Sequence, residues 1–262
     1  MFKRQENKGL TYFVSSALEA AGALHAFSTR LGGVSQGPFS SLNFGNPTAS
    51  DLHDDESNLN ENYRRLHDAT GLKDYERLWV FQSHSATVVE PKPGQPLGYA
   101  CPADGLISDA PRTALAMRSA DCAPVLACNT ETGRIGAFHI GWRGAAQGLA
   151  TTAVQKMGKA ETTIFAIGPC IGAKFFEVGP EVVHAFSEAP FHPSPFQRSA
   201  TAPDKWLFDL SSAIRQHLES AGVPPDHIDE SRLCTYENQD LFFSHRRDGL
   251  TTGRMVALIG RR

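Results

Sequence analysis

The stretch Arg134-Ile-Gly-Ala-Phe-His-Ile140, followed directly by Gly141-Trp-Arg-Gly-Ala-Ala-Gln-Gly-Leu-Ala-Thr-Thr-Ala-Val-Gln-Lys-Met-Gly158, decides the fold class. Its first seven residues predict a strand. Apolar side chains then recur at helical spacing over 144–158, which predicts a helix. The chain therefore combines strands and helices through glycine-rich turns, and the same alternation can be followed in both directions from here.

The rest of the chain contains more strands than helices. Apolar runs predict strands over residues 24–30, 78–81, 87–90, 113–117, 124–128, 162–167 and 255–259. Helical spacing and caps predict helices over residues 56–71, 180–189 and 209–221. Residues 31–45 are a turn-rich loop, and 91–102 are a proline-rich surface connection. Because helices do not alternate strictly with strands, we expect an α+β fold, and one domain over residues 1–262.

Composition excludes several classes of protein. The 262 residues carry 25 Lys+Arg and 28 Asp+Glu, a net charge of −3, which gives no basic surface for nucleic acid. No apolar run approaches the roughly 18 residues that span a membrane, and no secretory signal is visible, so we expect a cytoplasmic protein. The five cysteines are widely spaced and odd in number, which argues against a disulfide framework.

Three predicted strand ends carry ligands that a metal would accept. They lie in Gln82-Ser-His84, in Ala120-Asp-Cys-Ala-Pro124 and in Phe138-His-Ile-Gly-Trp-Arg-Gly144. Two imidazoles and one thiolate would form a three-ligand zinc site with one open coordination position, as in catalytic zinc centres. Spacing alone does not require a metal, because His84 and Cys122 lie far apart in the chain.

The same atoms allow a different chemistry. Cys122 as a thiolate, His139 as its base and Asp121 nearby would form a nucleophilic hydrolase without metal. The residues do not distinguish this hydrolase from the zinc site.

Two further segments contain groups that bind anions or bases. The glycine turn before the helix at 144–158 offers free amide N–H groups, and Arg143 adds a guanidinium suited to phosphate. The alternative is a tight turn with Arg143 in a surface ion pair. Later in the chain, Phe242 and Phe243 are followed by arginines 246, 247 and 254. In one interpretation, these residues hold a base or a phosphate. In the other, the phenylalanines belong to the core and the arginines to a solvated turn.

Seven motifs together resemble the laccase-domain family, also called multicopper polyphenol oxidase-like or broad-specificity purine nucleoside phosphorylases. The resemblance covers about residues 24–259 in the expected order. The motifs are Phe27-Ser-Thr-Arg-Leu-Gly-Gly-Val-Ser, Ser41-Leu-Asn-Phe-Gly, Gln82-Ser-His84, Ala120-Asp-Cys-Ala-Pro-Val, His139-Ile-Gly-Trp-Arg-Gly, Gly168-Pro-Cys-Ile-Gly and Phe243-Ser-His-Arg-Arg.

This resemblance implies a four-layer α/β/β/α fold with a mixed β-sandwich, and a zinc site at His84, Cys122 and His139. It also implies phosphorolysis of adenosine, inosine, guanosine and methylthioadenosine, with adenosine deamination as a second activity. Peptidoglycan editing and copper-dependent phenol oxidation are the family's other descriptions. We discount the oxidase because several coppers need more ligands than three residues provide, although copper could replace zinc.

On this hypothesis, phosphate and nucleoside are the small-molecule partners, and we expect a monomer. Arg30 and Arg143 are the candidate phosphate ligands, and Asn43 is a candidate polar contact to the substrate. The sequence departs from the family pattern at two positions. Ser85 stands where glycine is common, and His245 stands where tyrosine is usual and so changes the polarity of the pocket.

Overall fold

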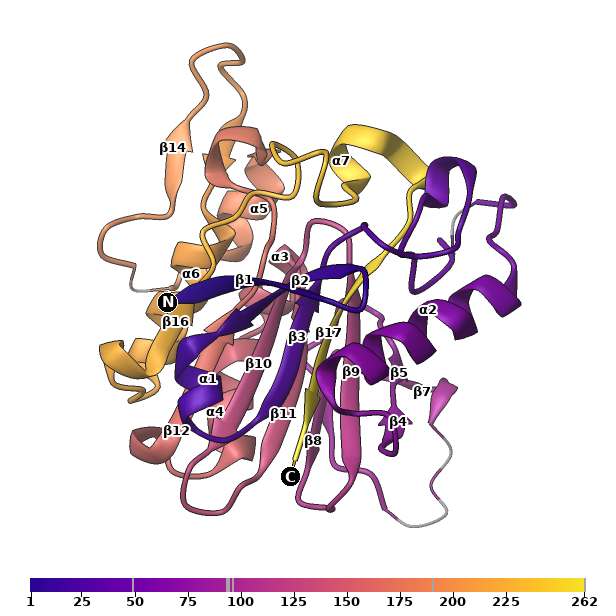
Figure 1. The fold of residues 1–262 in the computed structure, drawn as a ribbon. Helices are drawn as coiled ribbons and strands as arrows, with labels where there is room; N and C mark the ends of the chain where they lie inside the picture. The colour runs from indigo at the N-terminus through magenta and orange to yellow at the C-terminus, as the bar shows by residue number, and fades with distance from the viewer. Residues whose placement is uncertain (49, 93–94, 96, 190, 262) are drawn as a thin grey trace.

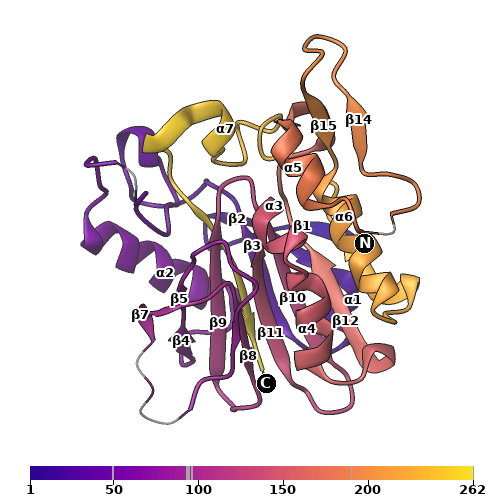
Figure 2. The ribbon, with the colours of Figure 1, turned by 180° about the vertical axis from the view of Figure 1, so that it is seen from behind.

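The computed structural model describes residues 1–48, 50–92, 95, 97–189 and 191–261. Two six-stranded sheets lie face to face at its centre, and helices cover their outer faces (Figures 1 and 2). The first sheet has the order β1 (Phe2–Asn7), β2 (Leu10–Ser15), β3 (Leu24–Ser28), β17 (Met255–Gly260), β9 (Thr113–Ser119) and β4 (Glu76–Leu78). The second has the order β16 (Ile228–Glu230), β12 (Thr163–Ile167), β10 (Ala123–Asn129), β11 (Ile135–Ile140), β8 (Gly105–Ser108) and β6 (Val88–Val89).

Smaller elements complete the structure. A three-stranded sheet contains β13 (Glu177–Val178), β15 (Trp206–Phe208) and β14 (Phe196–Arg198), and a two-stranded sheet contains β5 (Val80–Phe81) and β7 (Gly98–Pro102). The helices are α1 (Ser16–Ala20), α2 (Glu56–Thr70), α3 (Trp142–Ala146), α4 (Leu149–Met157), α5 (Pro180–Ala185), α6 (Leu210–Ser220) and α7 (His245–Asp248). Within the described ranges, no helix combines the length and apolar character needed to cross a membrane.

Three apolar clusters separate four layers, which confirms the predicted α+β fold and its α/β/β/α arrangement. One cluster lies between α2 and the first sheet, and a second lies between the two sheets. A third lies between the second sheet and helices α4 and α6. Strand β10 shows why the second sheet lies between two layers: Val125 and Ala127 face the helices, whereas Leu126 and Cys128 face the first sheet. A strand buried on both faces reads as a continuous apolar run.

Most of the predicted elements are present, with several corrections. The helix predicted over 144–158 is two helices, α3 and α4, because Gly148 adopts a left-handed φ of 79° between them. The strand predicted over 78–81 is divided between β4 and β5. The connection predicted over 91–102 ends in a strand, β7, and its residues 93, 94 and 96 lie outside the described residues. The helix predicted over 180–189 ends at Ala185.

Candidate metal centre and its cavity

Strand pairing brings the three predicted ligands together. His139 lies on β11 and pairs with Pro124 at the start of β10, so Cys122 lies beside this end of β11. His84 follows β5 in the next turn. One ligand atom from each of the three side chains lies within 4.8 Å of the others, and the two imidazole centroids are 5.1 Å apart. This spacing allows all three to bind one ion.

A glycine makes this approach possible. A Cβ added at Gly141 would lie 2.8 Å from the Cys122 sulfur and 3.3 Å from the His84 ring. Such a contact is shorter than van der Waals packing allows, so a larger residue would push the ligands apart. Gly141 therefore allows the ligands to approach one another, in addition to forming the turn into α3.

A buried carboxylate, Asp104, holds two of the ligands in place. Its Oδ1 lies 2.9 Å from His139 Nδ1, which leaves the other ring nitrogen of His139 to face Cys122. Its Oδ2 accepts hydrogen bonds from the Ser83 and Ser85 amides, at 3.1 and 2.7 Å, and from the Ser85 hydroxyl at 2.9 Å. These bonds fix the turn that carries His84. A carboxylate behind a histidine ligand is the usual support of a metal site.

The three groups also shift one another's protonation. Burial opposes ionisation of the Cys122 thiol, but His139 and His84 outweigh it and lower the pKa of Cys122 to about 6. Burial would lower the pKa of His139, but Cys122 and Asp104 raise it to about 9. Burial would raise the pKa of Asp104, but His139 and Ser85 lower it to about 2. Without a metal, the site therefore favours a thiolate beside a charged imidazole.

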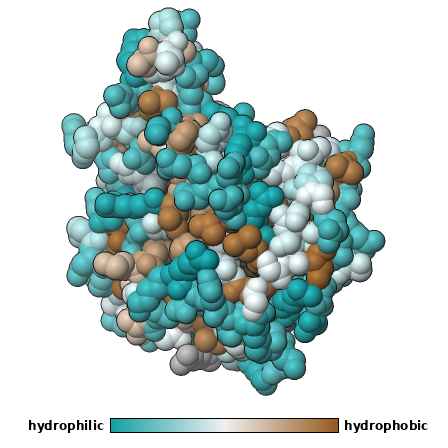
Figure 3. All heavy atoms as spheres, turned by 45° about the horizontal axis from the view of Figure 1, so that its top comes forward, coloured by the Kyte–Doolittle hydropathy of each residue, from teal (hydrophilic) through white to brown (hydrophobic). Residues whose placement is uncertain are grey.

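The ligands line a cavity of about 390 Å³. Figure 3 shows the end of the molecule that carries α7, where apolar residues gather near the centre of the face among hydrophilic ones. The wall includes aromatic side chains from Phe81, Tyr99, Trp142 and Phe176, and basic ones from Arg118, Arg143, His245, Arg246 and Arg254. The cavity thus offers apolar surface and cationic groups beside one candidate metal centre.

A second buried carboxylate, Asp121, holds the C-terminal wall of the cavity. It accepts hydrogen bonds from the Thr235 hydroxyl at 2.6 Å, the Ser244 hydroxyl at 3.0 Å and the Arg246 amide at 2.7 Å. Its φ of 97° lies in the left-handed region, which aspartate tolerates better than most residues. Asp104, not Asp121, is the carboxylate on His139, which corrects the arrangement expected for the metal-free hydrolase.

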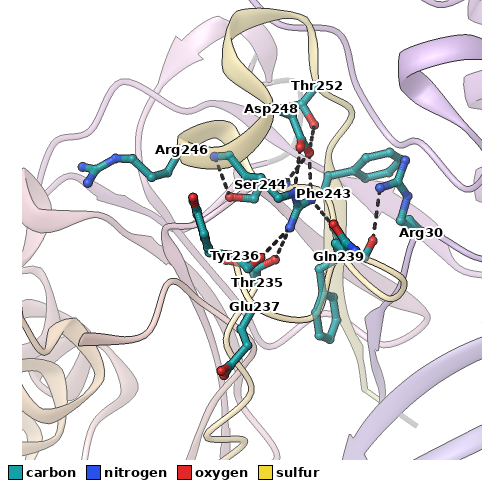
Figure 4. A network of polar contacts seen from close by, with 12 residues as sticks. Arg30, Thr235, Tyr236, Glu237, Gln239, Phe243, Ser244, Arg246, Asp248 and Thr252 are labelled. Carbon is teal, nitrogen blue, oxygen red and sulfur yellow. Dashed lines mark hydrogen bonds and ion pairs between the residues drawn. The ribbon is translucent and has the colours of Figure 1, made fainter. Parts of the chain in front are cut away.

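The residues predicted to bind substrate lie in different places. Arg143 lines the cavity and stacks on Trp142, with its Cζ 4.3 Å from the ring centroid. Arg30 is not among the residues that line it. Its guanidinium donates to the Ser40 and Gln239 carbonyls and stacks on Phe243, and Figure 4 shows it on the opposite side of the network from Arg246. These contacts do not support the predicted phosphate role of Arg30.

Asn43 also lies outside the cavity lining, fully buried beneath it. Its amide nitrogen donates to Asp54 at 3.0 Å, and its Oδ1 accepts from the Gly45 and Arg254 amides at 3.2 and 2.8 Å. A contact between Asn43 and the substrate stays a prediction, but its hydrogen bonds hold the backbone of two segments at the cavity.

Sequence reasoning missed several residues of this site. Asp104 has no local pattern that marks it, because its partner His139 lies 35 positions away. Arg118 directly follows the strand predicted over 113–117, and the residue itself carries no pattern that marks it as part of a cavity. The strand end itself was the available signal, since Cys122 follows four residues later.

The donor set fits a metal ion. Two imidazoles and a thiolate, with a carboxylate behind one imidazole, are ligands that zinc accepts in catalytic sites. The described residues contain one such cluster, at His84, Cys122 and His139. A centre with several coppers would need additional histidines nearby.

Comparisons with known proteins identify the family of the chain. Residues 24–262 match the family described as multi-copper polyphenol oxidoreductase laccase. The purine nucleoside phosphorylase YlmD of Geobacillus stearothermophilus is 39% identical over 258 residues, which cover 92% of this chain and 91% of that protein. The purine nucleoside phosphorylase YfiH of Escherichia coli is 38% identical, covering 88% and 91%.

Solved structures extend the likeness to the fold. The crystal structure of the Geobacillus YlmD superposes with a TM-score of 0.87 at 34% identity, over 98% of each chain. A Bacillus licheniformis protein titled hypothetical protein YfiH gives the same TM-score at 28% identity, over 99% of each chain. The chain therefore belongs to the multi-copper polyphenol oxidoreductase laccase family, and its relatives in that family include proteins named purine nucleoside phosphorylases.

Proposed function

We propose that this protein is a zinc-dependent purine nucleoside phosphorylase that also deaminates adenosine. The observation that carries the proposal is that the His84–Cys122–His139 cluster and several guanidinium groups line the same cavity. The names of the relatives, at 38–39% identity over most of the chain, support the same activity. Adenosine, inosine, guanosine and methylthioadenosine are the proposed substrates, and a cytoplasmic monomer remains the expected state.

The wall of the cavity is suited to a purine. Tyr99 is 73% exposed and Leu250 is 52% exposed, although both are large apolar residues, and both line the cavity. Phe81 and Trp142 add aromatic faces. Exposed apolar side chains gathered in one place indicate a binding surface, and aromatic rings stack well on a purine base.

The residues of the site have separate tasks in phosphorolysis. His84, Cys122 and His139 would hold the zinc, which when bound supplies a Lewis acid and a means to activate water. Asp104 keeps the His139 ring and the His84 turn in the orientation that binding requires. Cationic side chains on the wall attract phosphate, and they stabilise negative charge that develops on the departing purine. The apolar wall holds the base in one orientation.

The test is incubation with adenosine, with and without phosphate, followed by chromatography. With phosphate we expect adenine and ribose 1-phosphate, and without phosphate we expect inosine from deamination. Protein that produces neither adenine nor inosine, although loaded with zinc, would contradict the proposal. Cys122→Ala should lose bound zinc together with both activities. Turnover of inosine by Cys122→Ala at the wild-type rate would show that the site is assigned wrongly.

One observation favours a second candidate, the metal-free Cys–His hydrolase. Cys122, His139 and Asp104 lie in the order of a nucleophile, its base and an orienting carboxylate. Asp104 Oδ1 lies 2.9 Å from His139 Nδ1, and a ring nitrogen of His139 lies within 4.8 Å of the Cys122 sulfur. Metal analysis of untagged protein distinguishes the two. Near-stoichiometric zinc supports the phosphorylase, whereas metal-free protein with a reactive Cys122 supports the hydrolase.

A further inference from the structure

None of the four arginines of the cavity wall has an acidic partner among the described residues. Two of them are also linked to each other through one buried side chain, Asn43. Arg118 and Arg254 both line the cavity. Ion pairs among the described residues use other arginines, such as Arg134, Arg215 and Arg247, and none joins Arg118 or Arg254 to a carboxylate. Placing two guanidinium groups in one partly closed cavity is unfavourable unless an anion lies between them or nearby.

The backbone of Arg118 is held by hydrogen bonds, whereas its guanidinium is not. It lies at the end of β9, where the Gln82 side chain bonds its backbone twice: Gln82 Nε2 donates to the Arg118 carbonyl and Gln82 Oε1 accepts from the Arg118 amide, at 2.6 and 2.9 Å. Its guanidinium stacks on Trp79, with the Cζ 5.0 Å from the ring centroid. Within the part of the chain that is described, its guanidinium nitrogens donate no hydrogen bond to protein, so they remain available to a ligand.

Arg254 is half-buried, and hydrogen bonds hold both its side chain and its backbone. Its Nη1 donates to the carbonyls of Thr252 and Gly253, at 2.7 and 3.0 Å, and its amide donates to Asn43. Burial lowers the pKa of Arg254, and the positive charge of Arg118 lowers it further. The two like charges are thus close enough to repel each other, and a shared anion would relieve the repulsion.

The loop beneath the cavity holds the two arginines in position. A Cβ added at Gly45 would lie 2.7 Å from Arg118 Nη1 and 2.8 Å from its Cδ, so only a glycine lets the guanidinium lie here. Asn43 Oδ1 accepts hydrogen bonds from the amides of both Gly45 and Arg254. One buried side chain therefore ties the backbone beside Arg118 to the backbone of Arg254.

From these contacts we infer that Arg118 and Arg254 form the subsite for inorganic phosphate, with Asn43 and Gly45 as its positioning residues. Guanidinium groups bind phosphate oxygens through paired hydrogen bonds, and two of them match a dianion in charge. The inference deepens the proposed function, on which it rests for the identity of the anion. It assigns to Arg118 and Arg254 the role that the sequence predicted for Arg30 and Arg143.

The first test measures binding of inorganic phosphate to the zinc-loaded protein without nucleoside, by calorimetry. Arg118→Gln and Arg254→Gln should each weaken binding at least about ten-fold, because each removes charge-assisted hydrogen bonds. Arg198→Gln is the matched control. Arg198 also stacks on a tryptophan, Trp206, with its Cζ 4.7 Å from the ring centroid, but it lies outside this cavity. Unchanged phosphate affinity in both cavity variants, or binding of a nucleoside monophosphate but not of phosphate, would overturn the inference.

A second variant tests the subsite without removing charge. Gly45→Ala should displace the Arg118 guanidinium and weaken phosphate binding by several-fold, and Arg118→Lys should restore less than the wild-type affinity because it lacks the planar fork. Zinc content and thermal unfolding of each variant report whether the fold is intact. Phosphate binding by folded Gly45→Ala equal to wild type would contradict the close contact on which the subsite depends.

The kinetic arm separates this inference from the proposed function. If phosphorolysis occurs, both arginine variants should raise KM for phosphate more than KM for nucleoside. Phosphorolysis with an unchanged KM for phosphate would refute the subsite alone. Phosphate binding that depends on both arginines, in protein that cleaves no nucleoside, would refute the phosphorylase and leave the subsite in place.

Discussion

Asp104 and Asp121 are two buried carboxylates of one site, and they hold different parts of it. Asp104 bonds the ring of His139 and the turn that carries His84, so its contacts lead to the metal ligands. Asp121 bonds the Ser244 hydroxyl and the Arg246 amide, so its contacts lead to the C-terminal wall of the cavity. Although Asp121 precedes Cys122 in the sequence, it bonds none of the three metal ligands.

The difference indicates that metal affinity and substrate affinity depend on separate supports. The support for the metal uses groups from the bend before β8, from β11 and from the turn after β5. The support for the wall joins the turn before β10 to the segment that contains α7, which crosses the end of the sandwich in Figure 1. If the two supports are independent, substitutions can change zinc binding without changing nucleoside binding, and the reverse.

The largest effect is expected from Asp104→Ala. The change frees the His139 ring and leaves the Ser83 and Ser85 amides without their acceptor. Loss of a carboxylate behind a metal ligand typically weakens metal binding by about 10- to 100-fold. The partly buried amides left unpaired should also lower the free energy of unfolding, by about 1 kcal/mol. Competition with a zinc-binding dye measures the first effect, and denaturant unfolding measures the second.

Asp54→Ala is the matched control for this variant. Asp54 is another buried carboxylate that accepts two side-chain hydrogen bonds, from Asn43 and Asn58, and neither partner is a metal ligand. Its loss should affect stability, but zinc affinity should remain close to that of the wild type. Equal zinc affinity in Asp104→Ala and Asp54→Ala would break the distinction between the two carboxylates.

The sequence revealed the ligands of the site more readily than their supports. His84, Cys122 and His139 each stand at a predicted strand end, and the resemblance to the laccase-domain family singled them out as metal ligands. Asp104 was missed because it is joined to His139 by pairing between distant segments, and a single acidic residue carries no periodic signal. Arg118 and Arg254 were not distinguished from other arginines, because the link between them through Asn43 and Gly45 is visible only in three dimensions.

The fold shows a similar division. The buried strands β9, β10 and β11 are continuous apolar runs, and they were predicted, whereas β2 and β8, which are buried at every position, were missed. The N-terminal strand β1 was missed because it is a charged edge strand, in which Lys3, Arg4 and Glu6 face solvent. The break between α3 and α4 was missed because an apolar stripe continues past Gly148, although the backbone there turns left-handed.

A smaller effect on the metal is expected from Gly141→Ala. The new methyl group would lie 2.8 Å from the Cys122 sulfur, so the thiolate or the β11 end must shift. All three ligands and Asp104 remain, and we therefore expect zinc binding to weaken by roughly ten-fold or less, below the loss in Asp104→Ala. Gly172→Ala is the control, because its methyl group would lie 3.2 Å from the sulfur of Cys234, a cysteine outside the cluster. Zinc affinity that stays unchanged in Gly141→Ala would contradict the tight approach of the ligands.

The smallest effect is expected from Asp121→Asn, and it should fall on the other support. Asparagine tolerates the φ of 97°, but its amide nitrogen cannot accept the hydrogen bonds that Asp121 Oδ2 accepts from Ser244 and Arg246. The loss of one or two hydrogen bonds should loosen the wall that carries His245 and Arg246. We therefore expect KM for nucleoside to rise by about three- to ten-fold. Ser244→Ala, which removes one of these donors, should raise KM less.

Because Asp121 bonds none of the ligands, zinc content should stay at the wild-type level. A loss of zinc in Asp121→Asn comparable to that in Asp104→Ala would mean that the two carboxylates support one structure and that metal and wall are not separable.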